Sequence, residues 1–543
     1  EQEKGAEIRA ILSFRDRSVR EMEVWQMSIL PYVAEDRKGV PTLYVDGEPY
    51  LMLAGEIHNS SASSLEYMKK KVWPGIRGLN LNTLIVPVTL ETVEHEEDCF
   101  DFSLTEGMLE QAREEKMRLV LLWFGLWKNG ESSYVPEWVK RDTDRFQRAC
   151  YPGGILSDTV TPLCQEAVRA DQKAFRRLMK FLKEKDGEQH TVLMVQVENE
   201  IGFLGADRDY SVPAEEAFAK PVPQKLNSEF AGISWEQLYQ ETAPEMFMAW
   251  HYACAVEEIA SAGKEEYPLP MYVNAWLNQF PDRPGNYPSG GPIARNLSIW
   301  RIAAESIDIF APDIYLSDFD GVCREYTAGG APLLIPEARR DAVTASNVFP
   351  AFAIYHTLGF SPFGIEDFRA DKEEEELSAT DQEVLEKLQI DELAFVYNGT
   401  GRFLARSYEL MDSMKKIYFQ YRGTDSMHGY LQKNEHEKGT ILRLAGCELE
   451  LSYRKHSLSE PGCAGMIIED SEESFFIAGC NTDIRLLPRR GSGQKHLTVL
   501  SMEEGSFENG QWRRGRMLNG DERYHKRLGS VPEILRFRYK AER

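Results

Sequence analysis

The sequence is short of positive charge and has no long apolar run. Its 543 residues include 63 Lys and Arg against 87 Asp and Glu, so the formal net charge is −24. Nucleic-acid binding requires concentrated Lys and Arg to meet the phosphates, and this composition therefore predicts no nucleic-acid partner. No apolar run approaches the roughly 18 residues of a membrane-spanning helix, which predicts no membrane association. Apolar residues still make up 42% of the chain, enough for a large core.

Metal-binding and redox patterns are also missing. The eight cysteines form no C-x-x-C pair, and the ten histidines form neither H-x-H nor H-E-x-x-H. These absences exclude the common zinc and thioredoxin sites, so we expect no metal and no cofactor. No signal peptide opens the chain, although it begins at Glu1 without a Met and so can have been trimmed. With unpaired-looking cysteines, this favours a cytoplasmic location.

Short apolar segments alternate with longer amphipathic or loop-rich stretches from Tyr44 onward. Eight of them resemble strands: Tyr50–Gly55, Thr83–Val88, Arg118–Phe124, Thr191–Glu198, Pro270–Trp276, Ile307–Tyr315, Pro332–Glu337 and Ser361–Glu366. Unbroken apolar strands separated by helices indicate a parallel sheet that is covered on both faces. Eight such units predict an α/β fold, the (β/α)8 TIM barrel. A doubly wound open sheet is the alternative, but it normally carries a Gly-rich loop after its first strand, where this chain has one glycine, Gly55.

The pattern divides the chain into three parts. Residues 1–27 are charged and weakly periodic, and we interpret them as an N-terminal arm. Residues 28–423 form the predicted barrel domain. Residues 424–543 contain short alternating segments separated by turn signals such as Asn509-Gly510. This second pattern predicts a smaller C-terminal β-sandwich-like domain.

Two carboxylates stand at the ends of predicted strands. The fourth strand continues into Glu198-Asn199-Glu200, and the seventh ends in Glu337. Either glutamate alone is ordinarily a cap or ion-pair residue. In a (β/α)8 barrel, however, the C-terminal strand ends share one bowl, and two carboxylates that flank a bond are what glycoside hydrolysis needs. Together with Asn199, which can bond a sugar hydroxyl, Glu200 and Glu337 predict a catalytic pair with carboxyl groups roughly 5 Å apart.

Other side chains near strand ends are candidate sugar ligands. Trp127 and Trp276 follow the third and fifth strands, where each can stack on a sugar ring or simply pack at the rim. Asn274 lies on the fifth strand and faces the same region. Tyr315 ends the sixth strand, where its hydroxyl can hydrogen-bond the nucleophile, or a backbone carbonyl instead.

Two further glutamates close the predicted first and eighth strands. Glu56 and Glu366 are neighbours in the predicted barrel and can bond sugar hydroxyls at the pocket floor. The alternative is an ion pair with Arg339 or Arg369. We include both glutamates among the candidate substrate-binding residues.

Several motifs resemble one enzyme family. The segment Gln196-Val197-Glu198-Asn199-Glu200-Ile201-Gly202 resembles the Q-V-E-N-E-Y-G segment of glycoside hydrolase family 35, the β-galactosidase family of retaining (β/α)8 enzymes. The family's N-T, H-E-P, Y-D-F-S and L-P-A-W segments are similar to Asn82-Thr83, Val93-Glu94, Phe100-Asp101-Phe102-Ser103 and Val135-Pro136-Glu137-Trp138. The resemblance spans roughly residues 40 to 370. It implies that Glu200 is the general acid/base, Asn199 the ligand of the sugar 2-hydroxyl and Glu337 the nucleophile.

The chain departs from the larger members of the family where they read the sugar. Their C-A-E-W segment is replaced by Gly125-Leu126-Trp127-Lys128-Asn129, so the role of an acidic sugar ligand falls to Asn129 or its neighbours. The first-strand loop, residues 55–63, is similar instead to a divergent bacterial branch with the pattern G-E-x-x-N-S-S-A-S. These changes leave the implied reaction type intact. They do not leave the identity of the sugar settled, because they affect the groups that would bind its hydroxyls.

The sequence therefore predicts a retaining, exo-acting β-glycosidase, foremost a β-galactosidase, that acts on an oligosaccharide or glycoside. A β-glucosidase or a β-glycosyl transferase is the alternative within the enzyme class. A non-catalytic carbohydrate-binding barrel is the alternative outside it, and the intact pair of glutamates counts against that interpretation. Assembly into a homo-oligomer stays open.

Overall fold

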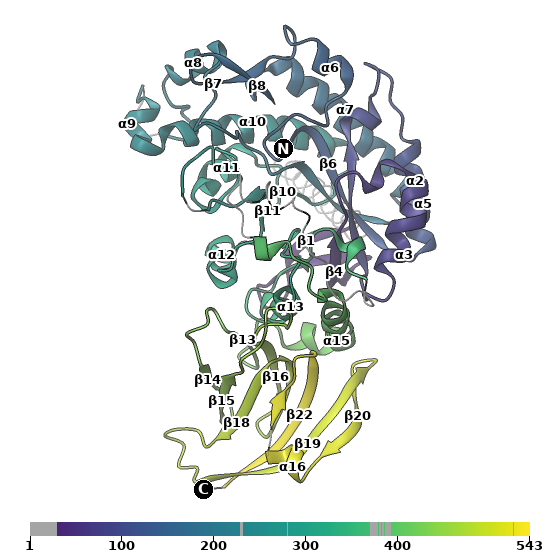
Figure 1. Cartoon of the computed structure of the whole chain (residues 1–543), viewed down its shortest axis with the longest axis vertical. Helices are drawn as coiled ribbons and strands as arrows, with labels where there is room; N and C mark the ends of the chain where they lie inside the picture. Colours follow the sequence, from purple (N-terminus) through teal and green to yellow (C-terminus); the bar gives the residue numbers. More distant parts are fainter. Residues whose placement is uncertain are drawn as a thin grey trace, which may run out of the picture.

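The computed structural model describes residues 30–227, 232–279, 281–369, 378, 382, 385, 392–524 and 526–542. The proposed arm at residues 1–27 lies outside this range. A helical and parallel-stranded part and a C-terminal part made mostly of strands lie end to end (Figure 1). Among the described residues, every helix is too short or too polar to cross a lipid bilayer.

Seven parallel strands form the curled sheet of a TIM barrel, in the order β11-β10-β9-β6-β5-β4-β12. Their bounds are β4 Met52–Glu56, β5 Thr83–Thr89, β6 Arg118–Lys128, β9 Val192–Asn199, β10 Met271–Trp276, β11 Ile309–Asp313 and β12 Gly359–Phe360. The predicted α/β barrel fold is therefore confirmed. Each of the first six expected segments overlaps one of these strands.

The last two expected strands differ from the prediction. Residues 332–338 form no regular strand and pair only through isolated bridges, Ile335 with Phe360 and Ala338 with Ile314. Pro332 and Pro336 have no backbone N–H to donate, which prevents a continuous ladder. These bridges nevertheless close the ring between β11 and β12.

The eighth strand lies before the expected segment, Ser361–Glu366, and does not overlap it. It is the two-residue β12, and the chain then turns through Gly364, whose φ is 66°, into a 3-10 turn at Ile365–Asp367. Glu366 therefore stands on this turn and not at a strand end.

Helices cover the outside of the sheet. They are α2 Leu65–Tyr67, α3 Trp73–Ile76, α4 Leu90–Val93, α5 Ser103–Glu114, α6 Glu137–Arg141, α7 Gln165–Asp186, α8 Val212–Phe218, α9 Trp235–Tyr239, α10 Ala243–Glu266, α11 Leu297–Ala303, α12 Phe319–Tyr326, α13 Val343–Ala353 and α15 Thr400–Tyr421. A hairpin of β7 Arg148–Tyr151 and β8 Ile155–Val160 lies in the long connection after β6. The apolar stripe of each long helix packs on the sheet and forms the main core.

A small antiparallel sheet packs against one end of the barrel. It consists of β1 Tyr32–Glu35, β2 Pro41–Val45 and β3 Glu48–Pro49. Leu43 and Val45 of β2 belong to the same buried cluster as the barrel-interior side chains Met52, Val120 and Leu122. This half of the barrel interior is thus a packed apolar core.

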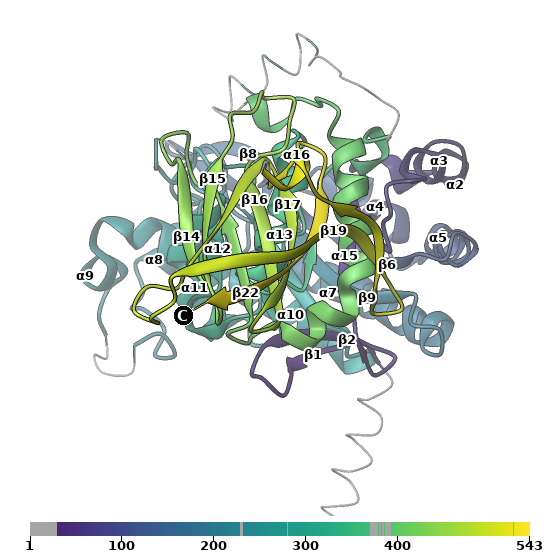
Figure 2. The same ribbon diagram turned by 90° about the horizontal axis from the view of Figure 1, so that it is seen from below.

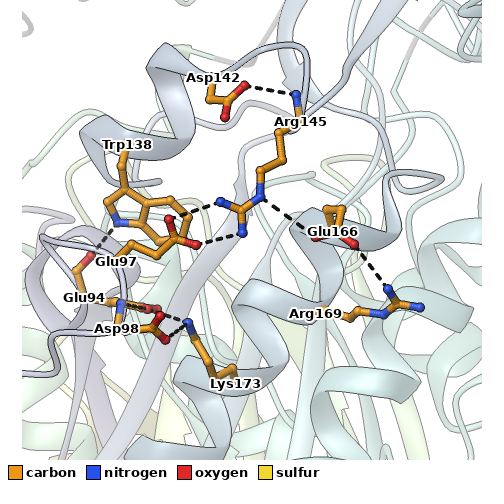
Figure 3. A network of polar contacts seen from close by, with 9 residues as sticks. All are labelled: Glu94, Glu97, Asp98, Trp138, Asp142, Arg145, Glu166, Arg169 and Lys173. Carbon is orange, nitrogen blue, oxygen red and sulfur yellow. Dashed lines mark hydrogen bonds and ion pairs between the residues drawn. The ribbon is translucent and has the colours of Figure 1, made fainter.

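A network of polar contacts joins α4, α6 and α7 outside the barrel (Figure 3). Arg145 donates to both carboxylate oxygens of Glu97, at 3.1 and 2.7 Å. The Lys173 ammonium lies 2.8 Å from the fully buried Glu94 carboxylate, and the Trp138 indole donates to the Glu94 carbonyl at 2.9 Å. Glu94 and Trp138 belong to two of the motif segments, so these motifs hold the loops after β5 and β6 in place.

The C-terminal part is a sandwich of two antiparallel sheets. One sheet has the order β13-β16-β17-β22-β19-β20 and the other β14-β15-β18-β21. The bounds are β13 Met427–Leu431, β14 Gly439–Arg443, β15 Glu448–Tyr453, β16 Ala464–Ser471, β17 Ser474–Cys480, β18 Thr482–Leu487, β19 His496–Glu508, β20 Gln511–Leu518, β21 Arg527–Leu528 and β22 Glu533–Glu542, with a short helix α16 at Asp521–Tyr524. The expected strand-rich C-terminal region is confirmed.

The six-stranded sheet lies between the barrel and the second sheet. One face contributes Ile467, Phe475 and Phe537 to the core of the sandwich. The other face packs on α13 and α15 of the barrel, as seen from below in Figure 2. Asn509 and Gly510, with φ of 53° and 81°, form the predicted hairpin turn between β19 and β20.

Candidate active site

A cavity of about 240 Å³ opens at the C-terminal ends of the barrel strands. Polar residues line one part of it and apolar side chains the rest. The lining comprises Asn59, Lys128, Asn129, Glu200, Trp276, Leu277, Gln279, Asp313, Tyr315, Leu316, Glu337, Phe363, Leu385 and Phe395. Both predicted catalytic glutamates are among them.

Glu200 follows β9 in a strained stretch of backbone. Its φ is 43° and that of Glu198 is 62°, values that non-glycine residues seldom adopt. The Glu200 amide donates to Oδ1 of Asn274 at 2.8 Å, which fixes this turn from the neighbouring strand β10. Such strain persists only where the surroundings impose it, and it is concentrated at functional sites.

Glu337 is held by donors on both of its carboxylate oxygens. The Tyr315 hydroxyl donates to Oε2 at 2.6 Å. The Nδ2 groups of Asn199 and Asn274 face Oε1 at 3.5 and 3.4 Å. These three donors fix the carboxylate at the pocket floor.

A third carboxyl group, that of Asp313, joins the predicted pair. One carboxylate oxygen of each of Glu200, Asp313 and Glu337 lies within 4.8 Å of the other two. Asp313 ends β11, and its Oδ2 accepts a hydrogen bond from Asn274 at 2.7 Å. Among the described residues, this is the one group of acids spaced closely enough to hold a metal ion. Without an ion, such closely spaced carboxyl groups cannot all be charged, and some must retain protons.

Burial and mutual repulsion raise the pKa values of these acids. Desolvation, then the charge of Glu337, raises the pKa of Glu200 to about 8, with Lys128 and Asp313 opposing. The pKa of Asp313 is raised well above its usual value, first by burial and then by Glu337 and Glu200. Glu200 is therefore protonated at neutral pH, the state that a general acid requires.

This pKa shift predicts a pH-dependent stability. The folded protein keeps the Glu200 proton up to pH about 8, while an ordinary glutamate loses it near 4.5. A raised carboxyl pKa lowers the free energy of unfolding as the pH rises through this window. The side chain in Glu200→Gln does not titrate. We therefore expect the free energy of unfolding of this variant, relative to that of wild type, to increase by ~3 kcal/mol between pH 5 and pH 8.

Urea denaturation of both proteins at pH 5, 6, 7 and 8 measures this difference. Glu325→Gln is the matched control, because Glu325 is exposed on α12. If the difference in unfolding free energy between Glu200→Gln and wild type stays constant across the pH range, the raised pKa of Glu200 is contradicted.

Glu56 is fully buried, and neither of its carboxylate oxygens has a hydrogen-bond partner among the described residues. Burial, followed by the charge of Glu337, raises its pKa well above normal. Glu56 does not line the cavity but lies close enough to Glu337 and Lys128 to feel their charges. A neutral, protonated carboxyl group is the form that can remain buried without a partner.

The structure brings most of the other predicted residues to the pocket. Asn129, Trp276 and Tyr315 line it directly. Asn199 and Asn274 are fully buried behind the cavity wall, and their side-chain amides contact the carboxylate of Glu337. Asn274 therefore orients Glu200, Asp313 and Glu337, whereas the sequence suggested a direct sugar contact.

Two predicted ligands lie elsewhere. The Trp127 indole donates to the Val160 carbonyl at 2.9 Å and packs edge-on against Tyr252 in the core. Side chains alternate along β6, so Lys128 faces the pocket and Trp127 faces away. Glu366 accepts hydrogen bonds from the Ser61 hydroxyl at 2.6 Å and the His58 amide at 3.0 Å, and borders a different cavity. Neither residue is placed to contact a sugar in the pocket.

Sequence reasoning missed Lys128 and Asp313. Both stand at the last residue of a barrel strand, β6 and β11, but the expected strands ended at Phe124 and Tyr315, so the strand ends inferred from the sequence did not select them. Lys128 donates to Oδ1 of Asn199 at 2.8 Å and to Oδ1 of Asn129 at 2.5 Å.

A buried acid pair supports the end of β6 that carries Lys128. Glu198 points away from the pocket, and its carboxylate accepts from the amides of Leu126 and Trp127 at 3.0 and 2.8 Å. Asp171 also accepts from Leu126, at 3.1 Å. A side chain at Gly125 would meet these carboxylates, since a Cβ atom there would lie 2.2 Å from Asp171 and 2.5 Å from Glu198. Glycine is thus required at this position.

Comparison with known proteins gives two family matches. Residues 42–285 match the model of Glycosyl hydrolases family 35, and residues 404–529 match a Domain of unknown function (DUF5597). No curated protein matches the chain.

Solved structures with related folds are distant in sequence. The catalytic domain of β-amylase from Paenibacillus polymyxa is 12% identical with a TM-score of 0.44, over 59% of this chain and 93% of that one. The β-galactosidase from Bacillus circulans sp. alkalophilus is 12% identical with a TM-score of 0.46, over 68% of this chain and 57% of that one. The β-galactosidase from Rahnella sp. R3 is 12% identical with a TM-score of 0.44, over the same shares. The chain thus spans less than two thirds of these two β-galactosidases.

The family match covers the barrel from β4 to β10, including Asn199 and Glu200, and agrees with the motifs found in the sequence. This region of the chain is thus similar to glycosyl hydrolases family 35.

Proposed function

We propose that the protein is a retaining, exo-acting β-glycosidase and that β-galactosides are its main substrates. The spacing of the acids carries the proposal: carboxylate oxygens of Glu200 and Glu337 lie within 4.8 Å of each other. Retaining glycosidases hold their two carboxyl groups about 5 Å apart, whereas inverting enzymes separate them by about 6.5 Å or more to admit a water molecule. The family match supports the reaction class but ends before Glu337.

The mechanism assigns the two glutamates different protonation states. Glu337 attacks the anomeric carbon while Glu200 gives its proton to the glycosidic oxygen, so the aglycone leaves as an alcohol. Glu200, now ionised, then takes a proton from water, whose oxygen attacks the anomeric carbon and releases Glu337. The raised pKa of Glu200 suits the acid of the first step, and the Tyr315 hydroxyl suits a charged Glu337.

The shape and charge of the pocket favour removal of one terminal neutral sugar. The cavity is small, about 240 Å³, and Trp276, Phe363 and Phe395 are among the residues that line it. Aromatic side chains stack on the apolar faces of sugar rings. Several carboxyl groups converge on the floor, which disfavours an acidic sugar.

Paired substrates test the proposal. We expect 4-nitrophenyl β-galactoside to be hydrolysed faster than the β-glucoside. Glu337→Ala should abolish the rate, and Glu200→Ala should lower steady-state turnover because water then lacks its base. A faster rate on the β-glucoside would agree with the proposed reaction but would make glucose, and not galactose, the preferred sugar. No hydrolysis of any β-glycoside would contradict the proposal and favour a carbohydrate-binding protein.

A further inference from the structure

We propose that Lys128 is a specificity-determining residue that binds the sugar 3-hydroxyl and fixes Asn199; this assignment rests on the function proposed above. Lys128 ends β6, is 6% exposed and lines the cavity. It occupies the region in which the larger family members carry an acidic sugar ligand.

The hydrogen bonds of Lys128 determine how two amides are oriented. Its ammonium has donors only, so the atom of Asn199 that faces it at 2.8 Å must be Oδ1. Nδ2 of Asn199 is thereby directed to Glu337. The Lys128 ammonium also donates to Oδ1 of Asn129 at 2.5 Å, so this oxygen faces Lys128 as well. Without Lys128, either amide is free to turn its acceptor toward the pocket.

One donor of Lys128 is left for substrate. An ammonium carries three N–H groups, and two of them are used on the amide oxygens. Lys128 also lies over the Phe124 ring at 5.2 Å, which fixes the direction of its stem. Because Lys128 lines the cavity, the third N–H is available to a ligand hydroxyl.

The position of Lys128 indicates which hydroxyl it meets. Glu337 would attack the anomeric carbon, and Nδ2 of Asn199 lies beside its Oε1, so the hydroxyl nearest to Asn199 is the one on C2. Lys128 contacts the opposite side of the same amide. The next hydroxyl around the ring, on C3, is therefore the one that Lys128 reaches. The nearby carboxylates supply acceptors, while Lys128 and the two asparagines supply donors.

A cycle of enzyme and substrate changes tests the assignment. Wild type and Lys128→Met are compared on the hydrolysed 4-nitrophenyl glycoside and on its 3-deoxy and 4-deoxy analogues. In the wild type, loss of the 3-hydroxyl is expected to lower kcat/KM about 100-fold, the effect of one hydrogen bond from a buried charged donor. In Lys128→Met the same loss is expected to change kcat/KM less than about fivefold. The effect of the 4-deoxy change should be equal in both proteins.

The controls separate the possible failures. Lys264→Met removes a lysine that pairs with Asp308 at 2.6 Å outside the pocket, and it should behave as wild type. If Lys128→Met does not fold, the neutral and shorter Lys128→Gln replaces it in the same cycle. If turnover is too slow, calorimetric titration with the free sugars gives the same comparison as dissociation constants.

An unchanged 3-deoxy effect in the variant, or coupling to the 4-hydroxyl alone, overturns the assignment. The assignment is also overturned if Lys128→Met lowers kcat/KM by the same factor on all three substrates, because that result is the signature of a purely electrostatic role. A wild-type protein that hydrolyses no β-glycoside contradicts the proposed function itself, and this assignment with it.

Discussion

Glu337→Gln is expected to lower kcat for β-glycoside hydrolysis by about 10⁴-fold or more, while the protein remains folded. An amide cannot form the glycosyl-enzyme bond, and loss of a nucleophile removes most of the rate acceleration. Glutamine has the same shape as glutamate, so Tyr315 and the two asparagines still contact a side chain at this position. Initial rates on 4-nitrophenyl β-galactoside, together with thermal unfolding, measure both parts of the prediction.

The exposed Glu325→Gln on α12 is the control for a general effect of charge removal. Binding of the free sugar should survive in Glu337→Gln, because the donors around the pocket are unchanged. A loss of kcat below about tenfold would show that Glu337 is not the nucleophile.

Glu200→Ala is expected to lower kcat/KM about 10³-fold for substrates with poor leaving groups and much less for those with activated leaving groups. Proton donation matters most when the leaving alcohol is weakly acidic, and general acid catalysis contributes about 10² to 10⁴-fold. With an activated substrate, the first step proceeds without the acid and the glycosyl-enzyme accumulates, because water has lost its base.

Azide distinguishes this role from a structural one. It attacks the glycosyl-enzyme without needing a base, so added azide should restore turnover of Glu200→Ala and give a β-glycosyl azide. Rescue should be absent in Glu337→Gln, which forms no such intermediate. If azide leaves Glu200→Ala unchanged, Glu200 does not act as the acid/base.

The sequence predicted the barrel because its strands are buried on both faces and read as unbroken apolar runs. This signal depends on regular pairing, and it failed where pairing is irregular. Residues 332–337 are apolar but carry two prolines, and they pair only through isolated bridges. The eighth strand is only Gly359–Phe360 and precedes the expected segment. Gly364 then turns the chain and carries Glu366 away from the strand end.

Chemistry at the strand ends was predicted where the motif was strong. Asn199 ends β9 and Glu200 follows it, and Glu337 stands beside them in space. Lys128 and Asp313 occupy equivalent strand ends but have no motif of their own, so only the structure reveals that they join the site. Trp127 was misplaced because period-two alternation along β6 directs it outward.

Distances and protonation states lay beyond the sequence. The separation of Glu200, Asp313 and Glu337 depends on the closure of the barrel. This closure brings together the residue after β9, the last residue of β11 and the segment 332–337. The pKa of Glu200 near 8 depends on burial and on the charge of Glu337, and both follow from that closure.

Proton NMR of the first anomer released from a β-glycoside tests the central claim most directly. Two successive displacements at the anomeric carbon, first by Glu337 and then by water, must return the original configuration. We expect the β anomer to appear first and the α anomer to grow in only later by mutarotation. Initial release of the α anomer would contradict the retaining mechanism and the proposed roles of Glu200 and Glu337.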